Sequence, residues 1–421
     1  MPRWSPHARY RLYTGASSYT LPIRQFLCCL SDSADAATRL ETEICNRFEV
    51  ASACSVPMAR TGLYFGLKEL IRPGQRVIMS PLTIIDVVNM VLLAGGIPVF
   101  ADIRRKSCAI DPDQAESLID GRTGAMLITH LHGETAGAHE FRDICNRRGV
   151  PLIEDAAQAF GAIENGRRLG TIGHLGLYSF GFYKNLNAWR GGMLVSQDRD
   201  LITRIRRRVN GLPAFPRGRL LATAVHGLLT DVATWPPIFA SATYPILRRC
   251  LLSNIQTIHN RLDPEYGAKR MAMMPSEYLC RMTSSQTILA LEQLERIDAD
   301  TRIRIAKAAR YRRAPASLEM LIIPEWHGRD SNIYTYFPVQ CRERQALLQY
   351  AQRRRRDFTA QHLRNCADFP EFKEFFSDCS NARAAARELI LLPTYPRYPE
   401  SEIEKNVGLI QQFFAEQTHS C

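Results

Sequence analysis

Residues 76–102 read RVIMSPLTIIDVVNMVLLAGGIPVFAD, and this stretch decides the fold class. The apolar run Arg76–Met79 predicts a strand, and Ile84–Ala94 predicts a helix that ends at Gly95-Gly96. Ile97–Ala101 predicts a second strand. A strand, a helix of about ten residues and another strand form a βαβ unit, in which the two strands run parallel.

The same alternation continues downstream. Ala125–Ile128 predicts a strand, His139–Arg148 a helix, and Pro151–Ile153 a further strand. We therefore expect an α/β chain whose large domain has a mostly parallel central sheet flanked by helices. Thr129-His130 and Glu154-Asp155 follow two of these strands, and ligands of such sheets bind at the carboxyl ends of strands.

The remaining sequence predicts a smaller C-terminal α/β domain. Its expected elements are a long helix over Met282–Arg313, a strand over Tyr334–Val339, and helices over Arg342–Arg356 and Glu400–Phe414. The predicted division of the chain is residues 1–211 for the large domain with an N-terminal arm, 212–260 for an apolar, proline-containing insertion or linker, and 261–421 for the smaller domain.

The segment 212–260 combines long apolar runs with Trp235-Pro236-Pro237. Its prolines and Asp231 argue against a membrane-spanning helix. We expect it to be buried against a partner subunit of a homodimer. The alternative is contact with an anionic membrane surface through flanking arginines, which are Arg217, Arg219, Arg248 and Arg249.

Composition excludes several other classes of protein. The 421 residues are 46% hydrophobic, with Lys+Arg 54 against Asp+Glu 42 and a net charge of +12. The basic residues are scattered without interleaved aromatics, so we do not expect nucleic acid binding. The 12 Cys include no CxxC pair, which argues against a metal site. The first 20 residues lack an apolar secretory core, so the expected location is cytoplasmic.

Two segments carry the chemistry, EDAAQA at residues 154–159 and SFGFYKNL at residues 179–186. A carboxylate at a strand end, followed by a serine and a lysine, suits pyridoxal phosphate (PLP). Lys184 would form a Schiff base, Asp155 would keep the pyridine nitrogen protonated, and Ser179 would donate to the phosphate. The alternatives are that Asp155 only caps a helix and that Lys184 is a surface lysine.

These segments resemble the DegT-type sugar aminotransferases, fold-type I PLP enzymes that act on nucleotide-linked keto-sugars. The resemblance runs from about Leu40 to Phe414 and includes PGQRVI at 73–78, HLHG at 130–133 and LPTY at 392–395. It implies a PLP-dependent transferase of fold type I that takes an amino group from glutamate or glutamine, serves amino-sugar or polysaccharide biosynthesis, and forms a homodimer.

The resemblance also implies roles for individual residues. Lys184 would be the catalytic residue, and Gln158 would bond near the phenolic oxygen of the cofactor. Backbone amides at Arg60 and Thr61, at a helix start, would help Ser179 hold the phosphate. The resemblance also implies that Asp155, Ala157 and Ile84 contact the cofactor. It implies that His130, Asn185 and Arg190 contact the substrate or support the residues that do.

Four positions depart from the family pattern. Ile84 replaces an aromatic residue that stacks on the cofactor ring, and Ala59-Arg60 replaces a glycine-containing phosphate loop. Arg190 stands in the glycine-rich stretch after the lysine, and Leu279 replaces an asparagine lent to the neighbouring subunit. A non-catalytic, ligand-binding or regulatory relative is therefore the alternative function. A sugar dehydratase is disfavoured because Lys184 is present.

Overall fold

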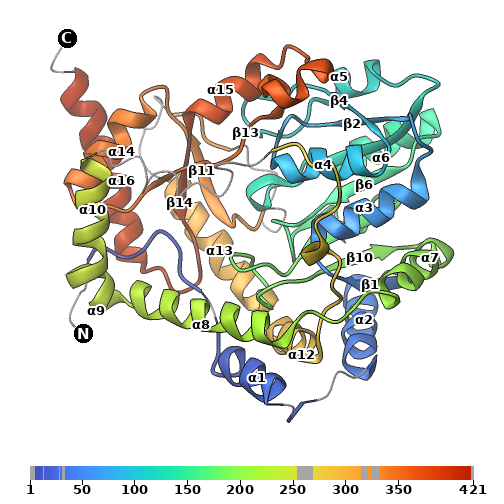
Figure 1. Ribbon diagram of the computed structural model, residues 1–421. Helices are drawn as coiled ribbons and strands as arrows, with labels where there is room; N and C mark the ends of the chain where they lie inside the picture. The colour runs from blue at the N-terminus through green and yellow to red at the C-terminus, as the bar shows by residue number, and fades with distance from the viewer. Residues whose placement is uncertain are drawn as a thin grey trace.

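The computed structural model describes residues 5–12, 14–27, 29–30, 34–253, 269–313, 321–324 and 332–418. At its centre lies a seven-stranded sheet of order β1-β10-β9-β6-β5-β2-β4 (Figure 1). The strands from β9 to β4 run parallel to one another, and β10 runs antiparallel to both of its neighbours, β9 and β1, so that β1 has the same direction as the parallel strands. This order confirms the mostly parallel sheet. Their bounds are β1 Ser52–Val56, β2 Arg76–Met79, β4 Ile97–Phe100, β5 Thr123–Thr129, β6 Leu152–Asp155, β9 Leu175–Ser179 and β10 Gly192–Ser196.

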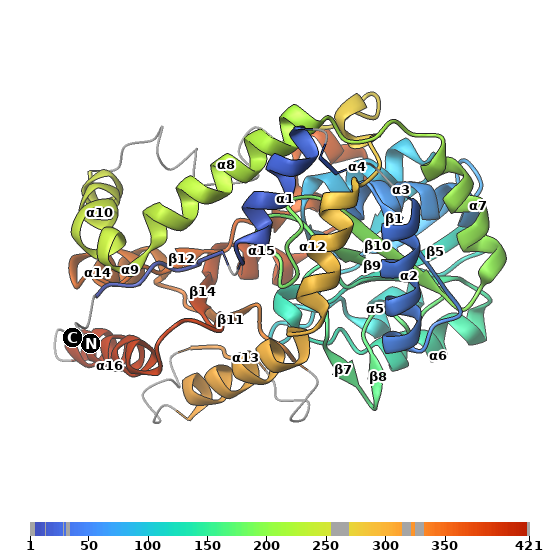
Figure 2. The ribbon, with the colours of Figure 1, turned by 90° about the horizontal axis from the view of Figure 1, so that it is seen from below.

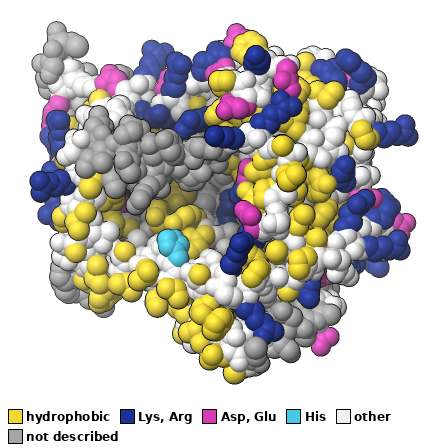
Figure 3. Space-filling model, viewed as in Figure 1, with side chains coloured by type: hydrophobic (Ala, Val, Ile, Leu, Met, Phe, Trp, Pro, Cys, Tyr) yellow, Lys and Arg dark blue, Asp and Glu magenta, His cyan; other side chains and the backbone are white. Residues whose placement is uncertain are grey.

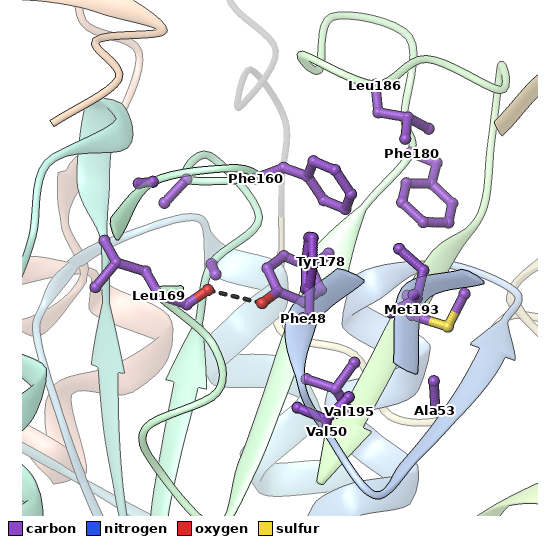
Figure 4. Packing of buried hydrophobic residues seen from close by; sticks show 14 of the residues in the cluster. Phe48, Val50, Ala53, Phe160, Leu169, Tyr178, Phe180, Leu186, Met193 and Val195 are labelled. Atoms are coloured by element: carbon purple, nitrogen blue, oxygen red, sulfur yellow. Dashed lines mark hydrogen bonds between the residues drawn. The ribbon is translucent and has the colours of Figure 1, made fainter. Parts of the chain in front are cut away.

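Helices cover both faces of this sheet. Successive strand residues point to opposite faces, so Ile78 joins one apolar core and its neighbours Val77 and Met79 join the other. In the first core Tyr178 packs beside Phe48, and its hydroxyl donates to the Leu169 carbonyl at 2.7 Å (Figure 4). The helices of the first core are α2 (Ala34–Phe48), α6 (Ala138–Arg148) and α12 (Ser284–Leu294), and those of the second are α3 (Ala59–Leu70), α4 (Ile85–Leu93) and α7 (Arg199–Asn210).

A third core holds the C-terminal elements together. It lies between a three-stranded antiparallel sheet of order β11-β14-β12 and helices α13, α14 and α16. The predicted strand and the last two predicted helices of this region are confirmed. The bounds are β11 Tyr336–Gln340, β12 Thr359–Ala360, β14 Leu389–Pro393, α13 Ile297–Arg312, α14 Arg344–Arg353 and α16 Glu400–Thr418.

The single helix predicted over 282–313 is wrong, because the chain breaks at Glu295-Arg296 into α12 and α13. Helix α12 packs against α2 beside the large sheet, whereas α13 packs against α16 in the third core (Figure 2). One straight helix could not meet both partners. The domain boundaries at 211 and 261 stay a prediction.

Residues 217–252 form helices rather than an extended linker. They are α8 (Arg217–Thr234), α9 (Pro236–Ile238), the π-helical turn η2 (Phe239–Thr243) and α10 (Tyr244–Leu252), and residues 254–260 lie outside the described part. Helix α1 (Ser17–Phe26) packs along α8 (Figure 2). Among the helices that the structure describes, none is both long and apolar enough to cross a bilayer.

The remaining elements are short and join these cores. A two-stranded ladder pairs β13 with β3, so it ties the C-terminal half of the chain to the loop after β2. The bounds are β3 Leu82–Thr83, β7 Ile163–Glu164, β8 Arg167–Arg168, β13 Arg364–Asn365, α5 Pro112–Ser117, α15 Ser380–Glu388, and the 3-10 turns η1 Leu131–Gly133, η3 Ser276–Tyr278, η5 Cys366–Asp368 and η6 Pro370–Phe375.

Candidate active site

A cavity of about 250 Å³ opens at the carboxyl edge of the large sheet. Asp155 ends β6, Ser179 ends the neighbouring strand β9, and Lys184 lies in the loop that follows β9. All three side chains line the cavity, together with the start of α3. The parallel order of β6 and β9 therefore brings together the three residues that the sequence singled out.

Asp155 is buried and does not cap a helix. The amide of Ala157 donates to its Oδ1 at 3.0 Å, and the chain then forms turns rather than a helix. The helix-cap interpretation of Asp155 is therefore wrong. Burial raises the pKa of Asp155, and the Ala157 amide, Lys184 and His130 partly offset this rise. A carboxylate in such a place is stabilised by a nearby positive charge.

Lys184 is not the surface lysine of the alternative interpretation. Its side chain faces the cavity, and burial lowers its pKa, an effect that Asp155 opposes and Arg60 reinforces. No hydrogen bond or ion pair from any described residue holds its amine. An amine with a lowered pKa is more often uncharged, and only the uncharged form is a nucleophile.

The start of α3 offers backbone donors to the cavity. The amides of Ala59, Arg60 and Thr61 lie in the first turn, where no helical carbonyl can accept them. The hydroxyl of Thr61 does not point there, because it donates to the Tyr278 carbonyl at 3.1 Å. Ser179 also lines this part of the cavity, so the amides and one hydroxyl form a place for an anion.

Two arginines border the same cavity, and both have other partners. Arg60 forms an ion pair with Asp86 and donates to the Tyr278 hydroxyl at 3.2 Å. Arg190 lies over the ring of Phe215, 4.8 Å from its centroid, and donates to the Glu277 carbonyl. The two guanidinium groups contribute positive charge to the rim while their positions are fixed by these contacts.

Not every predicted residue faces this cavity. Ile84 and Ala157 form part of its wall. Gln158 does not line it, because its Oε1 accepts the His132 amide at 2.9 Å. Asn185 faces a second, smaller cavity on the other side of Lys184.

His130 is engaged behind the sheet edge. Its Nδ1 accepts the Ala136 amide at 3.1 Å, so its Nε2 carries the proton and donates to Glu154 at 3.0 Å. Burial alone would raise the pKa of Glu154, but His130 and the amides of Gly173 and Gly170 hold it below its usual value. The pair positions the end of β6, and neither side chain lines the cavity.

Two residues from the 212–260 segment were missed as part of the site. Phe215 and Thr223 line the cavity, and α8, which carries Thr223, is pressed against Trp189. Trp189 also donates from its indole nitrogen to the Ser18 carbonyl at 2.9 Å. The sequence signal that could have pointed to this contact is Gly227, because a glycine inside an apolar helix indicates that another group approaches the helix closely.

The residues present fit pyridoxal phosphate. A buried carboxylate, an unbonded amine with a lowered pKa, a cluster of backbone amides with a hydroxyl, and apolar walls match its ring nitrogen, aldehyde, phosphate and ring faces in turn. The described residues hold no group of His, Cys, Asp and Glu that could bind a metal.

Comparison with known proteins agrees with this chemistry. GDP-perosamine synthase of Vibrio cholerae is 32% identical over 173 residues, so the match spans 41% of this chain and about half, 47%, of that protein. Spore coat polysaccharide biosynthesis protein SpsC of Bacillus subtilis (strain 168) is 26% identical over 370 residues, 85% of this chain and 84% of SpsC. The solved aminotransferase from Psychrobacter cryohalolentis shares the fold, with a TM-score of 0.76 and 20% identity over 98% of this chain and 99% of that one.

The family assignment rests on a match to a family-wide sequence profile. The sequence profile of the DegT/DnrJ/EryC1/StrS aminotransferase family covers residues 30–229 and 251–411. It omits the N-terminal arm with α1, and residues 230–250, which hold the end of α8, all of α9 and η2, and most of α10. The chain belongs to the DegT/DnrJ/EryC1/StrS family of PLP-dependent sugar aminotransferases.

Proposed function

We propose that the protein transfers an amino group from glutamate or glutamine to a keto-sugar nucleotide, for the synthesis of a glycan, surface polysaccharide or secondary metabolite. The observation that carries this proposal is the shared cavity of Asp155 and Lys184, with an anion site between them and α3. The names of two relatives, GDP-perosamine synthase and SpsC, support a nucleotide-linked sugar and polysaccharide synthesis.

The chain's own residues account for most of this chemistry. When bound, PLP supplies an electron sink that lets a proton leave the carbon next to the amine. Asp155 keeps the ring nitrogen protonated, and Ser179 with the amides of α3 holds the phosphate. Lys184 would attach the cofactor and then carry the proton, because its amine has a lowered pKa and no competing partner in the described part of the chain.

The walls of the cavity keep water out of the reaction. Ile84 stands where relatives of this family place an aromatic residue, and Phe215 lies at the rim with the Arg190 guanidinium over its ring. An apolar wall strengthens the interaction of Asp155 with a protonated ring, since charges interact more strongly away from water.

Spectroscopy and product analysis test this function. The purified protein should be yellow, and borohydride should remove the colour by fixing the cofactor on Lys184. A panel of keto-sugar nucleotides with glutamate or glutamine should then yield an amino-sugar nucleotide. Cofactor binding without amino transfer to any of the sugars would favour the alternative, a ligand-binding or regulatory relative.

We also propose a cytoplasmic homodimer whose interface includes the exposed apolar face of α8 and α1. Val225, Leu228, Leu229 and Val232 form one stripe of α8 at helical spacing, and Phe26 is exposed on the adjoining α1. Figure 3 shows hydrophobic side chains gathered over these helices along the lower edge. A patch of this kind marks a contact surface.

The alternative is that this face contacts an anionic membrane surface. Arg248 is half-buried and donates to the Gln352 carbonyl at 2.8 Å and to the Arg353 carbonyl at 3.2 Å, at the end of α14. These bonds hold its guanidinium, and its contact with anionic headgroups stays a prediction. A lipid surface would be held by the apolar stripe and by the flanking basic residues.

A further inference from the structure

A second cavity, of about 40 Å³, lies on the side of Lys184 away from Asp155. Among the residues that the structure describes, Lys184 is the one that lines both cavities. The walls of the smaller cavity include Tyr10 and Arg11 of the N-terminal arm, residues 5–12, and Arg304 of α13. The arm lies outside the part of the chain that the family profile matches.

The arm is fixed in this position by contacts that do not involve Arg11. The amide and the Nε of Arg9 each donate to Asp357 at 2.8 Å, and Arg9 and Asp357 are both largely buried. The Tyr395 hydroxyl donates to the Ala8 carbonyl at 3.0 Å. Tyr10 meets the ring of Tyr183, next to Lys184, edge-on at 4.7 Å.

Arg11 is the residue in this arrangement for which the described part of the chain offers no partner. Its Nε is shielded from solvent, and among the described residues no atom accepts a hydrogen bond or ion pair from its guanidinium. Arg11 is half-buried, and a shielded cationic donor without an acceptor costs free energy that a bound anion would recover. The side chain is therefore poised for an anion.

The cavity is also positive as a whole. Arg304 is 8% exposed and donates to the Thr335 carbonyl at 3.3 Å, and none of the described residues that line the cavity is a carboxylate. The nearby Asp357 is bound by Arg9. Asp231 of α8 accepts on Oδ2 from Thr14 and Tyr19, while its Oδ1 has no partner among the described residues. Asp231 is therefore the carboxylate near the arm that could compete with a ligand for Arg11, and Asp231→Asn serves as the reference for a purely structural change.

We propose that Arg11, with Arg304, forms an oxyanion-binding subsite that holds a substrate beside Lys184. The inference rests on the proposed function and adds a substrate-positioning role for the arm. A guanidinium binds a carboxylate or a phosphate through two parallel hydrogen bonds, which fixes orientation as well as charge. The oxyanion is either the carboxylate of the amino donor or the diphosphate of the nucleotide sugar.

The test measures ligand binding to the PLP-loaded enzyme by calorimetry, with glutarate as the carboxylate probe and with GDP and UDP as diphosphate probes. Arg11→Gln should weaken one class of probe by roughly tenfold to a hundredfold, the range of a hydrogen bond to a charged group. Arg11→Lys, which keeps the charge but loses the fork, should restore part of the affinity. Loss confined to glutarate identifies the amino donor, and loss confined to GDP or UDP identifies the nucleotide.

Arg24→Gln is the matched control, because it removes an equal charge from an exposed position on α1. Thermal unfolding of each variant shows whether the arm stays docked. Unchanged affinity for all probes in Arg11→Gln, or destabilisation equal to that of Asp231→Asn with no change in binding, overturns the subsite. A protein that binds no PLP contradicts the proposed function instead, and so the two failures are distinguishable.

Discussion

The indole of Trp189 lies against Gly227 so closely that a Cβ at residue 227 would be 2.3 Å from the ring. Trp189 follows the Lys184 loop and adopts a left-handed backbone, with φ at 66°. Gly227 belongs to α8, which carries Thr223 into the cofactor cavity. This contact therefore couples a helix far along the chain to the loop that holds the catalytic lysine.

Gly227→Ala should reduce stability and weaken PLP binding. The added methyl group would displace the Trp189 ring or α8, and overpacking of this kind costs about 1–3 kcal/mol. Gly218→Ala is the control on the same helix, because a Cβ there meets nothing within 4 Å. It should be neutral or slightly stabilising. Thermal unfolding with and without PLP measures both effects, and equal behaviour of the two variants would contradict the coupling.

Lys184→Ala should abolish amino transfer and the borohydride-sensitive absorbance together. The variant removes the only amine that lines the cofactor cavity within the described chain. Lys68→Ala, at an exposed position of α3, should leave both properties intact. Mass spectrometry after borohydride reduction should find the cofactor's mass on the peptide that holds residue 184. Its recovery on another lysine would show that the assignment is wrong.

The Asp155→Asn variant should still bind PLP. Its amino transfer should be slower by roughly a hundredfold or more, because a neutral amide does not hold the ring nitrogen of the cofactor protonated. Asp155 also raises the pKa of Lys184, so the variant should lower that pKa further. Single-turnover kinetics with glutamate separate the slow chemistry from binding. Turnover close to that of the unaltered enzyme would mean that Asp155 has only a structural role.

Glu154→Gln should lower stability at neutral pH by about 1–3 kcal/mol, the cost of weakening a buried, charged hydrogen-bond network. The folded chain holds the pKa of Glu154 below its unfolded value of about 4.3. Its stabilisation is therefore complete above that pH and is lost as the pH falls towards the lower, folded value. Denaturant titrations between neutral and acid pH should show less loss of stability on acidification in the variant. Parallel curves for the two proteins would contradict this role.

Leu229→Asp should convert the proposed dimer to a monomer, because it places a charge in the centre of the apolar face of α8. Leu229 is 63% exposed, and the control Phe376, on another part of the surface, is 59% exposed. Phe376→Gln should leave the assembly unchanged. Sedimentation velocity at micromolar concentration measures both. If the unaltered protein is a monomer that floats with anionic liposomes, the face serves a membrane instead.

The sequence by itself determined the parallel sheet and the positions of Asp155, Ser179 and Lys184 near its carboxyl edge. These features depend on local periodicity and on strand ends, which a short window of residues fixes. The bounds of β2 and the start of α16 agree with the expected positions for the same reason.

Only the tertiary structure decided which side chains complete the site. The Thr61 hydroxyl is held by the Tyr278 carbonyl, the break at Glu295 serves two separate cores, and Arg11 of the N-terminal arm lines one cavity together with Lys184. Each depends on contacts between residues far apart in sequence, whose partners no local pattern specifies. The packing of α8 and of the N-terminal arm around the Lys184 loop therefore sets the two cavities, and with them the chemistry that this chain can bring together.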